Sequence, residues 1–313
     1  MKRILRILGL ALAALAPAGC SKNDPILAPP STGGEASYTV VAAMGTSVTA
    51  GFESAGLVVH HQKKSFPYSF AKQAGSPAFA IPSVTADGIP PLLQISGWTP
   101  QGQPIIDNVG RTQGTPDNLA WPAPYNNMGV PGALLIDATS DTRYSDNSTP
   151  FPFIARPSLQ LGSILDQVAK LNATFVTFEY GANEVLGPGS QGSATPLMDV
   201  PTYGGLLHAT LDSLKALLPK AKVAIFTVPS ITSLPFFTTI RPRLDPTGTC
   251  RVIGPGGPLA DNDLVLLTAG SLLAAGQGVP SACGGTGNPL PASVILPAAR
   301  SEPAVSRTRS LSA

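Results

Sequence analysis

The chain has 313 residues, of which 43% are hydrophobic and 12% are charged, with a formal net charge of +2. This length and apolar content allow one large domain or two small ones, and they exclude a disordered chain. The 20 Lys and Arg residues are scattered, so we expect no nucleic-acid partner, which would need a clustered basic surface.

The first twenty residues predict a signal peptide. The basic start MKRILR precedes an apolar stretch that is too short to span a bilayer. The segment ends Ala18-Gly19-Cys20, which resembles the end of a bacterial lipobox, where Cys20 would be lipidated and become the mature N-terminus. Residues 16–18 also fit an ordinary cleavage site, so plain secretion stays open. Both interpretations predict an exported protein: a bacterial membrane-anchored lipoprotein or a periplasmic or extracellular protein, with residues 21–36 as a flexible tether.

The chain from residue 37 to 299 shows the alternation typical of an α/β domain. Short apolar or β-branched runs predict strands, and leucine-rich helical spacing predicts helices. The strands are expected over 38–44, 173–178 and 222–228, the helices over 158–171 and 203–218, and a further helix can begin within 47–57. Strands and helices in alternation indicate a parallel sheet that helices cover on both faces.

Two segments of the chain lack this alternation. Residues 58–125 form a long insertion rich in Pro, Gly, Gln and Ser, which predicts loops and short turns folded over the domain. Residues 300–313, RSEPAVSRTRSLSA, predict an irregular tail, either a disordered terminus or the out-of-frame end of an interrupted reading frame.

Cys250 and Cys283 are the cysteines outside the leader. In an exported protein two such cysteines predict a disulfide rather than a metal site, and no histidine lies near either of them in the sequence.

Three short motifs follow buried runs of the sequence. The first motif is Gly45-Thr46-Ser47-Val48, the second is Asn127-Met128-Gly129-Val130-Pro131-Gly132, and the third is Gly181-Ala182-Asn183-Glu184. We expect each of them just after a strand. Because ligands of open α/β sheets bind outside the carboxyl ends of the strands, the three motifs should converge there.

Taken together, the motifs resemble those of the SGNH, or GDSL-like, hydrolases, which are serine esterases and lipases on a flavodoxin-like α/β/α sandwich. The first motif of that family reads Gly-Asp-Ser-Leu, often followed by Thr-Ala-Gly, and here the chain reads GTSVTAG from residue 45. Gly132 matches the glycine of the family's second motif, and Gly181-x-Asn183 matches its third. The order and spacing agree over residues 38–230, with Thr46 in place of Asp and Glu184 in place of the usual Asp.

The resemblance implies ester hydrolysis. Ser47 would be the nucleophile that attacks the acyl carbon. The N–H groups of Ser47 and Gly132 and the side-chain amide of Asn183 would bind the developing oxyanion. We expect glycine at 132 because a side chain would keep that N–H away from the substrate. No cofactor is implied, since the sequence has neither a metal-binding cluster nor a phosphate-binding loop.

Each of these residues also has a structural interpretation. Ser47 can be a helix N-cap, Gly132 a turn glycine after Pro131, and Asn183 a cap of the next segment. Glu184 is expected to face solvent or to make a local ion pair.

The general base that a serine nucleophile needs is missing from the sequence. The family supplies it late in the chain as Asp-x-x-His, but the residues three before His60, His61 and His208 are Leu57, Val58 and Gly205. His208 is expected on a solvent-facing helix surface, and a base recruited from His60-His61 stays an alternative. The chain therefore resembles the front of such a hydrolase without its last strand and its Asp-His pair, and we expect poor solubility or dimerisation.

The sequence thus predicts an exported ester hydrolase of very low activity, acting on a lipid, an aryl ester or an acetylated sugar. Besides this small-molecule substrate, the predicted partner is the membrane, to which a lipid on Cys20 would anchor the protein. Two alternatives remain: a non-catalytic surface lipoprotein that binds acyl or carbohydrate ligands, and a purely structural cell-envelope protein.

Overall fold

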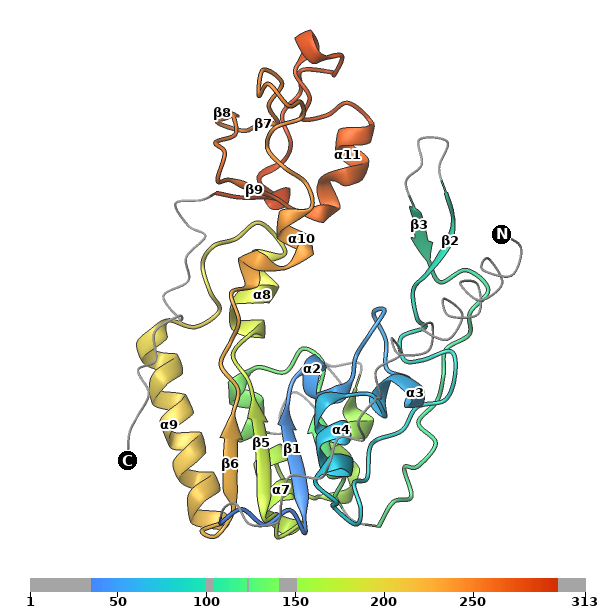
Figure 1. The fold of residues 1–313 in the computed structure, drawn as a ribbon, viewed down its shortest axis with the longest axis vertical. Coiled ribbons are helices and arrows are strands. Elements are labelled where there is room, and N and C mark those ends of the chain that lie inside the picture. The colour runs from blue at the N-terminus through green and yellow to red at the C-terminus, as the bar shows by residue number, and fades with distance from the viewer. Residues whose placement is uncertain (1–34, 99–103, 123, 141–150, 298–313) are drawn as a thin grey trace, which may run out of the picture. The chain divides into compact units, whose positions relative to one another are not determined.

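The computed structural model describes residues 35–98, 104–122, 124–140 and 151–297 (Figure 1). The predicted signal peptide with Cys20, residues 21–34 of the tether and the tail 300–313 lie outside the described residues. No helix within the described ranges is long and apolar enough to cross a membrane.

A four-stranded parallel sheet forms the centre of the fold, in the order β4-β1-β5-β6. The strands are β1 (Val41–Gly45), β4 (Asn127–Gly129), β5 (Phe175–Glu179) and β6 (Lys222–Ile225). The arrowheads of β1, β5 and β6 point the same way in Figure 1. The predicted α/β class with a parallel sheet is confirmed, and the three strands expected from the sequence are present with shifted ends.

The central strand β1 is built for burial on both faces. Its residues VAAMG are all buried, and the first four are 0% exposed. Small and β-branched side chains suit a strand that is covered on both sides, because neighbouring layers can then approach closely. This explains why the strand is a continuous apolar run rather than an alternating one.

Helices contact both faces of β5. Val176 and Phe178 belong to one core cluster with residues of α7 (Ile164–Lys170) and α9 (Val200–Leu217). Side chains alternate along a strand, so Phe175 faces the other way. There its ring lies 5.1 Å from that of Phe70 in α4 (Phe66–Gln73).

Two of the predicted helices form with different limits. The helix expected over 158–171 begins only at Ile164, because Ser163, not Ser158, is its N-cap. Ser163 and Asp166 form a capping box: the Ser163 hydroxyl accepts from the Asp166 N–H, and the Asp166 carboxylate accepts from the Ser163 N–H. The helix expected over 203–218 begins earlier, because Asp199 accepts a 2.8 Å hydrogen bond from the Thr202 N–H and caps α9.

The insertion 58–125 contains more regular structure than the sequence predicted. Besides loops it holds α3 (Val59–Gln62), α4 and the antiparallel hairpin of β2 (Gln94–Trp98) and β3 (Pro104–Asp107). Asn126, just after it, ties the insertion to the sheet, because its side chain accepts from Ala80 N and donates to Val41 O. The eight-residue helix α4 was missed because aromatic and polar residues break the leucine spacing there.

The chain after β6 does not extend the sheet within the described residues. It forms short helices and two-residue strands: α10 (Pro235–Thr238), β7 (Ile253–Gly254), β8 (Gly257–Pro258), β9 (Leu264–Val265), α11 (Gly270–Ala274) and β10 (Ile295–Leu296). Val252, Val265 and Leu290 belong to a small hydrophobic cluster within this part of the chain, whereas Phe237 of α10 and Leu296 of β10 pack with Val185 in another cluster.

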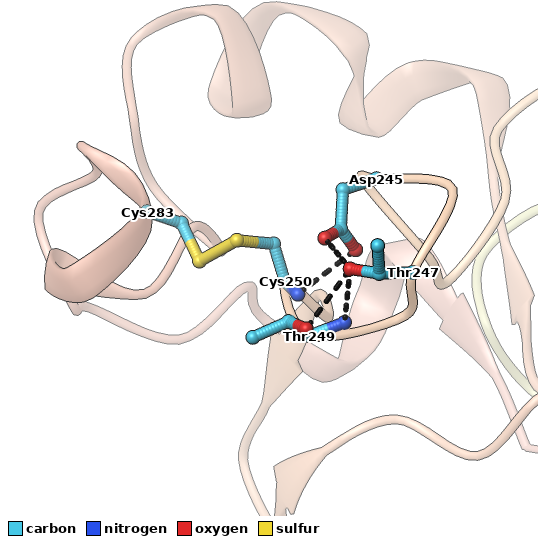
Figure 2. The surroundings of a disulfide bond; sticks show 5 residues. All are labelled: Asp245, Thr247, Thr249, Cys250 and Cys283. Carbon is cyan, nitrogen blue, oxygen red and sulfur yellow. Dashed lines mark hydrogen bonds between the residues drawn. A yellow bond between two sulfur atoms is a disulfide. The ribbon is translucent and has the colours of Figure 1, made fainter.

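The predicted disulfide joins Cys250 and Cys283, whose Cα atoms lie 6.0 Å apart (Figure 2). Beside it Asp245 accepts hydrogen bonds from the backbone N–H of Cys250, at 3.0 Å, and from the Thr247 hydroxyl. The bridge joins two residues that are 33 positions apart, in a part of the chain whose own hydrophobic cluster is small.

Strand β6 is an edge of the sheet, because within the described part of the chain it pairs with β5 alone. Its apolar residues Val223 and Ile225 are 38% and 52% exposed. An exposed apolar edge strand is a template for pairing with another chain.

We predict that removal of the disulfide destabilises the part of the chain that it closes. Cys250→Ser combined with Cys283→Ser should lower the free energy of unfolding by about 3 kcal/mol, because the bridge limits the conformational freedom of the unfolded chain. Urea unfolding measures this loss. Reductant should lower the stability of the wild type to that of the double variant and leave the double variant unchanged; equal stability with and without the bridge would contradict the prediction.

We predict that the protein self-associates through β6. Ile225→Lys should weaken association about tenfold or more, because the interface would bury the unpaired charge of the lysine. A tenfold change in affinity corresponds to ~1.4 kcal/mol, and burying an unpaired charge costs more than that. Sedimentation velocity over a concentration series measures the effect. The matched control is Ile106→Lys, at a residue of β3 that is 58% exposed, and it should leave association unchanged. A wild type that stays monomeric at all concentrations would refute the prediction.

Candidate active site

The carboxyl ends of β4, β1 and β5 meet at one edge of the sheet, and the three sequence motifs lie there. Gly45 stands opposite Gly129 on one side and opposite Glu179 on the other. Just beyond, the N–H of Val130 donates a 2.9 Å hydrogen bond to the carbonyl of Gly45. The parallel pairing thus brings together segments about 80 and 130 residues apart in the sequence.

The first motif turns directly from strand into helix. Thr46 is the N-cap of the one-turn helix α2 (Ser47–Ala50), although its side chain makes no capping hydrogen bond. Ser47 is the first residue inside the helix, so its interpretation as the N-cap is wrong. Ser47 is half-buried, between the buried Thr46 and the exposed Val48. The helix that could run through 47–57 ends after Ala50.

The turn is tight because Gly45 has no side chain. A Cβ atom there would lie 2.6 Å from the carbonyl oxygen of Glu179 and would overlap the hydroxyl of Thr49. Substitution would therefore push β1 away from β5 at the point where α2 begins.

The second motif differs from its prediction, because its first three residues are themselves the strand β4. A strand of three residues is too short to show a pattern in the sequence. Asn127 is 1% exposed, and its side-chain amide donates a 2.9 Å hydrogen bond to the carbonyl of Thr49. The second motif is thereby joined to α2.

Gly132 has a backbone conformation that by itself favours glycine. It lies exposed after the end of β4, and a Cβ atom on it would meet no atom within 4 Å. Its φ angle of +79° places it in the left-handed region, which favours glycine. Backbone conformation thus accounts for the residue within the protein itself, in agreement with its interpretation as a turn glycine.

The third motif begins α8 (Asn183–Gly189). The N-cap of this helix is Ala182, so the interpretation of Asn183 as a cap is wrong. The side-chain amide of Asn183 donates a 2.7 Å hydrogen bond to the carbonyl of Ala133, next to Gly132. A carboxamide nitrogen carries two hydrogens, so the second can bind another acceptor.

Glu184 was expected to face solvent or to make a local ion pair. Its side chain is instead buried, with an exposed fraction of 3%. One of its carboxylate oxygens accepts a 2.7 Å hydrogen bond from the N–H of Leu135, while Oε2 is buried without a partner among the described residues. Burial raises the pKa of Glu184, although the Leu135 N–H opposes that shift, and the nearby carboxylates of Asp137 and Glu179 raise it further.

Glu179 is a further residue of the site, which none of the three motifs contains. It ends β5, and its carboxylate accepts hydrogen bonds from the backbone N–H and the hydroxyl of Thr46, each at 3.0 Å, and from the hydroxyl of Thr49 at 2.9 Å. An acidic residue at the end of the buried run FVTF, two residues before the third motif, was the available signal.

No histidine within the described residues hydrogen-bonds Ser47. His208 is exposed on α9, as expected. His61 lies in α3 with its Nδ1 3.8 Å from a carboxylate oxygen of Glu53. Burial lowers the pKa of His61, and the negative charge of Glu53 acts in the opposite direction.

The described residues include no group of three or more His, Cys, Asp or Glu side chains that could hold a metal ion. Comparison of the chain with protein-family models, curated proteins and solved structures found no match.

We predict that Glu184 makes the fold less stable as the pH rises. Because its folded pKa is raised above the unfolded value of about 4.3, the native state binds more protons than the unfolded state between the two values. Stability should therefore fall as the pH increases through this window. Glu184→Gln keeps the shape and the oxygen that accepts from Leu135, so it should be more stable than the wild type at pH 7 and nearly equal to it at pH 4, measured by urea unfolding.

Asp199→Asn is the matched control with the opposite sign. The N–H and hydroxyl of Thr202 lower the pKa of Asp199, so its ionised form stabilises the fold above its unfolded pKa. This variant should lose stability at pH 7 relative to the wild type and regain it as the pH falls. An E184Q curve that runs parallel to the wild-type curve over pH 4 to 7 would contradict the assignment to Glu184.

Proposed function

We propose that the chain is an exported serine ester hydrolase of the SGNH class by ancestry, with Ser47 as its nucleophile. The observation that carries the proposal is the network that links the three motifs at one edge of the sheet. Asn127 joins the second motif to the helix of Ser47, and Asn183 joins the third motif to the residue after Gly132.

The strand order supports a flavodoxin-like α/β/α sandwich. If the four parallel strands are numbered along the chain, their order is 2-1-3-4. Flavodoxin-like sheets have the order 2-1-3-4-5, and they bind ligands where the order reverses, between strands 1 and 3. Here these strands are β1 and β5, whose ends carry the first and third motifs.

The chemistry of the site follows from these positions. The Ser47 hydroxyl oxygen attacks the acyl carbon as its proton passes to water, and the carbonyl oxygen gains negative charge as the tetrahedral intermediate forms. Collapse of the intermediate expels the alcohol, which takes up a proton from water, and a further water molecule hydrolyses the acyl-enzyme to the acid and frees Ser47. The N–H groups of Ser47 and Gly132 and the second amide hydrogen of Asn183 donate to that oxygen. Each such donor contributes about 2.7–4 kcal/mol to transition-state stabilisation in comparable enzymes.

Turnover is slow in this proposal, because none of the histidines in the described residues is hydrogen-bonded to Ser47 to accept its proton. An oxyanion hole without a base retains a residual rate, roughly 10³–10⁴-fold over water in protease variants that lack triad residues. The substrate is an acyl ester: a lipid, an aryl ester or an acetylated sugar.

Export is part of the proposal. The Cys250–Cys283 bridge supports an oxidising compartment, where such bonds form and persist. The leader sequence supports a lipid on Cys20 as the membrane anchor, with plain secretion as the alternative.

A ligand-binding lipoprotein is the second candidate function. The observation that favours it is the lack of a histidine bonded to Ser47 within the described ranges. In that case the same donors bind the acyl or carbohydrate ligand, and no bond is broken.

We predict that a fluorophosphonate probe labels Ser47 slowly. Ser47→Ala should abolish labelling, whereas Ser213→Ala, at an exposed serine of α9, should leave it unchanged. With p-nitrophenyl butyrate the turnover should lie well below the usual enzyme range of about 1–10³ per second.

Three outcomes separate the possibilities. Labelling that persists in the Ser47→Ala variant would rule out Ser47 as the nucleophile. Turnover at ordinary enzyme rates would show that a base exists. Ligand binding without labelling or turnover would favour the second candidate.

A further inference from the structure

The carboxylate of Glu179 is the most heavily hydrogen-bonded acidic group of the site, and ester hydrolysis as described gives it no task. It comes from β5, yet all three of its donors belong to the segment that carries Ser47: the N–H and hydroxyl of Thr46 and the hydroxyl of Thr49. These donors flank Ser47 on both sides in the sequence.

The donors are buried, and their geometry depends on the neighbouring strand. Thr46 and Thr49 are 1% and 0% exposed. The position that a side chain of Gly45 would occupy is filled by the Thr49 hydroxyl and by Glu179. The carboxylate, itself half-buried, therefore holds the first turn of α2 against the end of β5 through donors that are fully buried.

The hydroxyl of Thr46 donates its one hydrogen to the carboxylate of Glu179. It does not cap α2, although Thr46 occupies the N-cap position. Hydrogen bonds to an ionised acceptor are roughly twice as strong as neutral ones, so the choice of partner follows from the charge. Thr46 also occupies the position of Asp in the Gly-Asp-Ser-Leu pattern. In this chain the carboxylate beside the turn from β1 into α2 is that of Glu179, which belongs to β5.

We propose that Glu179 is the positioning residue of Ser47: through Thr46 and Thr49 it sets the orientation of the turn from which the Ser47 hydroxyl reaches its substrate. The proposal rests on the proposed function, because it concerns the reactivity of Ser47. Orientation of a reacting group matters strongly, since a displacement of about 1 Å can slow a reaction on the order of 10²-fold.

Glu179→Gln tests the proposal in the full-length protein. The variant replaces one acceptor oxygen with an NH₂ group, which cannot accept from Thr46 or Thr49. We expect the second-order rate constant for fluorophosphonate labelling of Ser47 to fall about 10- to 100-fold. The matched control is Thr177→Val. Thr177 lies on the same face of β5, is 2% exposed and has a hydroxyl without a partner among the described residues, so labelling should keep the wild-type rate.

An exchange variant separates positioning from a general loss of structure. Thr46→Asp combined with Glu179→Gln exchanges the two partners. The carboxylate then belongs to residue 46 of the first motif, and the side-chain amide at position 179 of β5 donates the hydrogen bond. The exchange variant should recover most of the labelling rate that Glu179→Gln loses. A purely structural role for Glu179 predicts no such recovery at temperatures well below the melting point of each variant.

Thr49→Val serves if Glu179→Gln fails to fold. It removes one donor and keeps the carboxylate, and it should slow labelling several-fold. Labelling of Glu179→Gln, or of Thr49→Val in its place, at the rate of the Thr177→Val control would overturn the proposal, as would an exchange variant no faster than Glu179→Gln alone. A wild type that is not labelled at Ser47 at all would overturn the proposed function together with this inference.

Discussion

The parallel hydrogen bonding of β1 between β4 and β5 is the constraint on which the rest of the structure depends. Residues 41–45 pair with residues 175–179 along their whole length, and residues 43–45 pair with residues 127–129. Parallel strands end at the same edge, so this register alone gathers three segments that are far apart in the sequence. Gly45 permits the close pairing at this edge, because a Cβ atom there would lie 2.6 Å from the carbonyl oxygen of Glu179.

Polar groups at that edge are satisfied from neighbouring strands rather than locally. Asn127 donates to Thr49, Asn183 to Ala133, and Glu179 accepts from Thr46 and Thr49. Glu184 is the exception, because one of its buried oxygens has no partner among the described residues. The two glutamates lie five residues apart and have opposite environments. A carboxylate bound by several donors stabilises its surroundings, whereas a buried and half-satisfied one is costly when it ionises.

The chain beyond β6 is stabilised by a disulfide and a small hydrophobic cluster rather than by a sheet. Its strands are two residues long and cannot build a sheet of useful area, and its cluster of six buried residues is small. Small cores gain from covalent closure, and here the Cys250–Cys283 bond closes a 33-residue separation. On the surface, Asp261 accepts hydrogen bonds from both Arg243 and Arg251, and these hydrogen bonds, together with the positive charges of the two arginines, lower the pKa of Asp261. The outer edge of β6 is left with exposed apolar side chains.

The sequence by itself determined the elements whose signals are local. The buried runs of β1 and β5, the leucine spacing of α9 and the two late cysteines all have patterns that a short window of residues contains. The same patterns placed helix ends poorly, because the caps at Ser163 and Asp199 depend on the hydrogen bonds of individual side chains, which the leucine spacing does not show.

Only the tertiary structure decided the strand order, the three-residue strand β4, the burial of Glu184 and the role of Glu179. The side-chain contacts among these join residues 49 to 133 positions apart, and the strand pairs join residues 47 to 134 positions apart. A carboxylate looks the same in the sequence whether it faces water or accepts buried hydrogen bonds. The difference arises from which strand ends beside it, and that is set by the packing of the whole sheet.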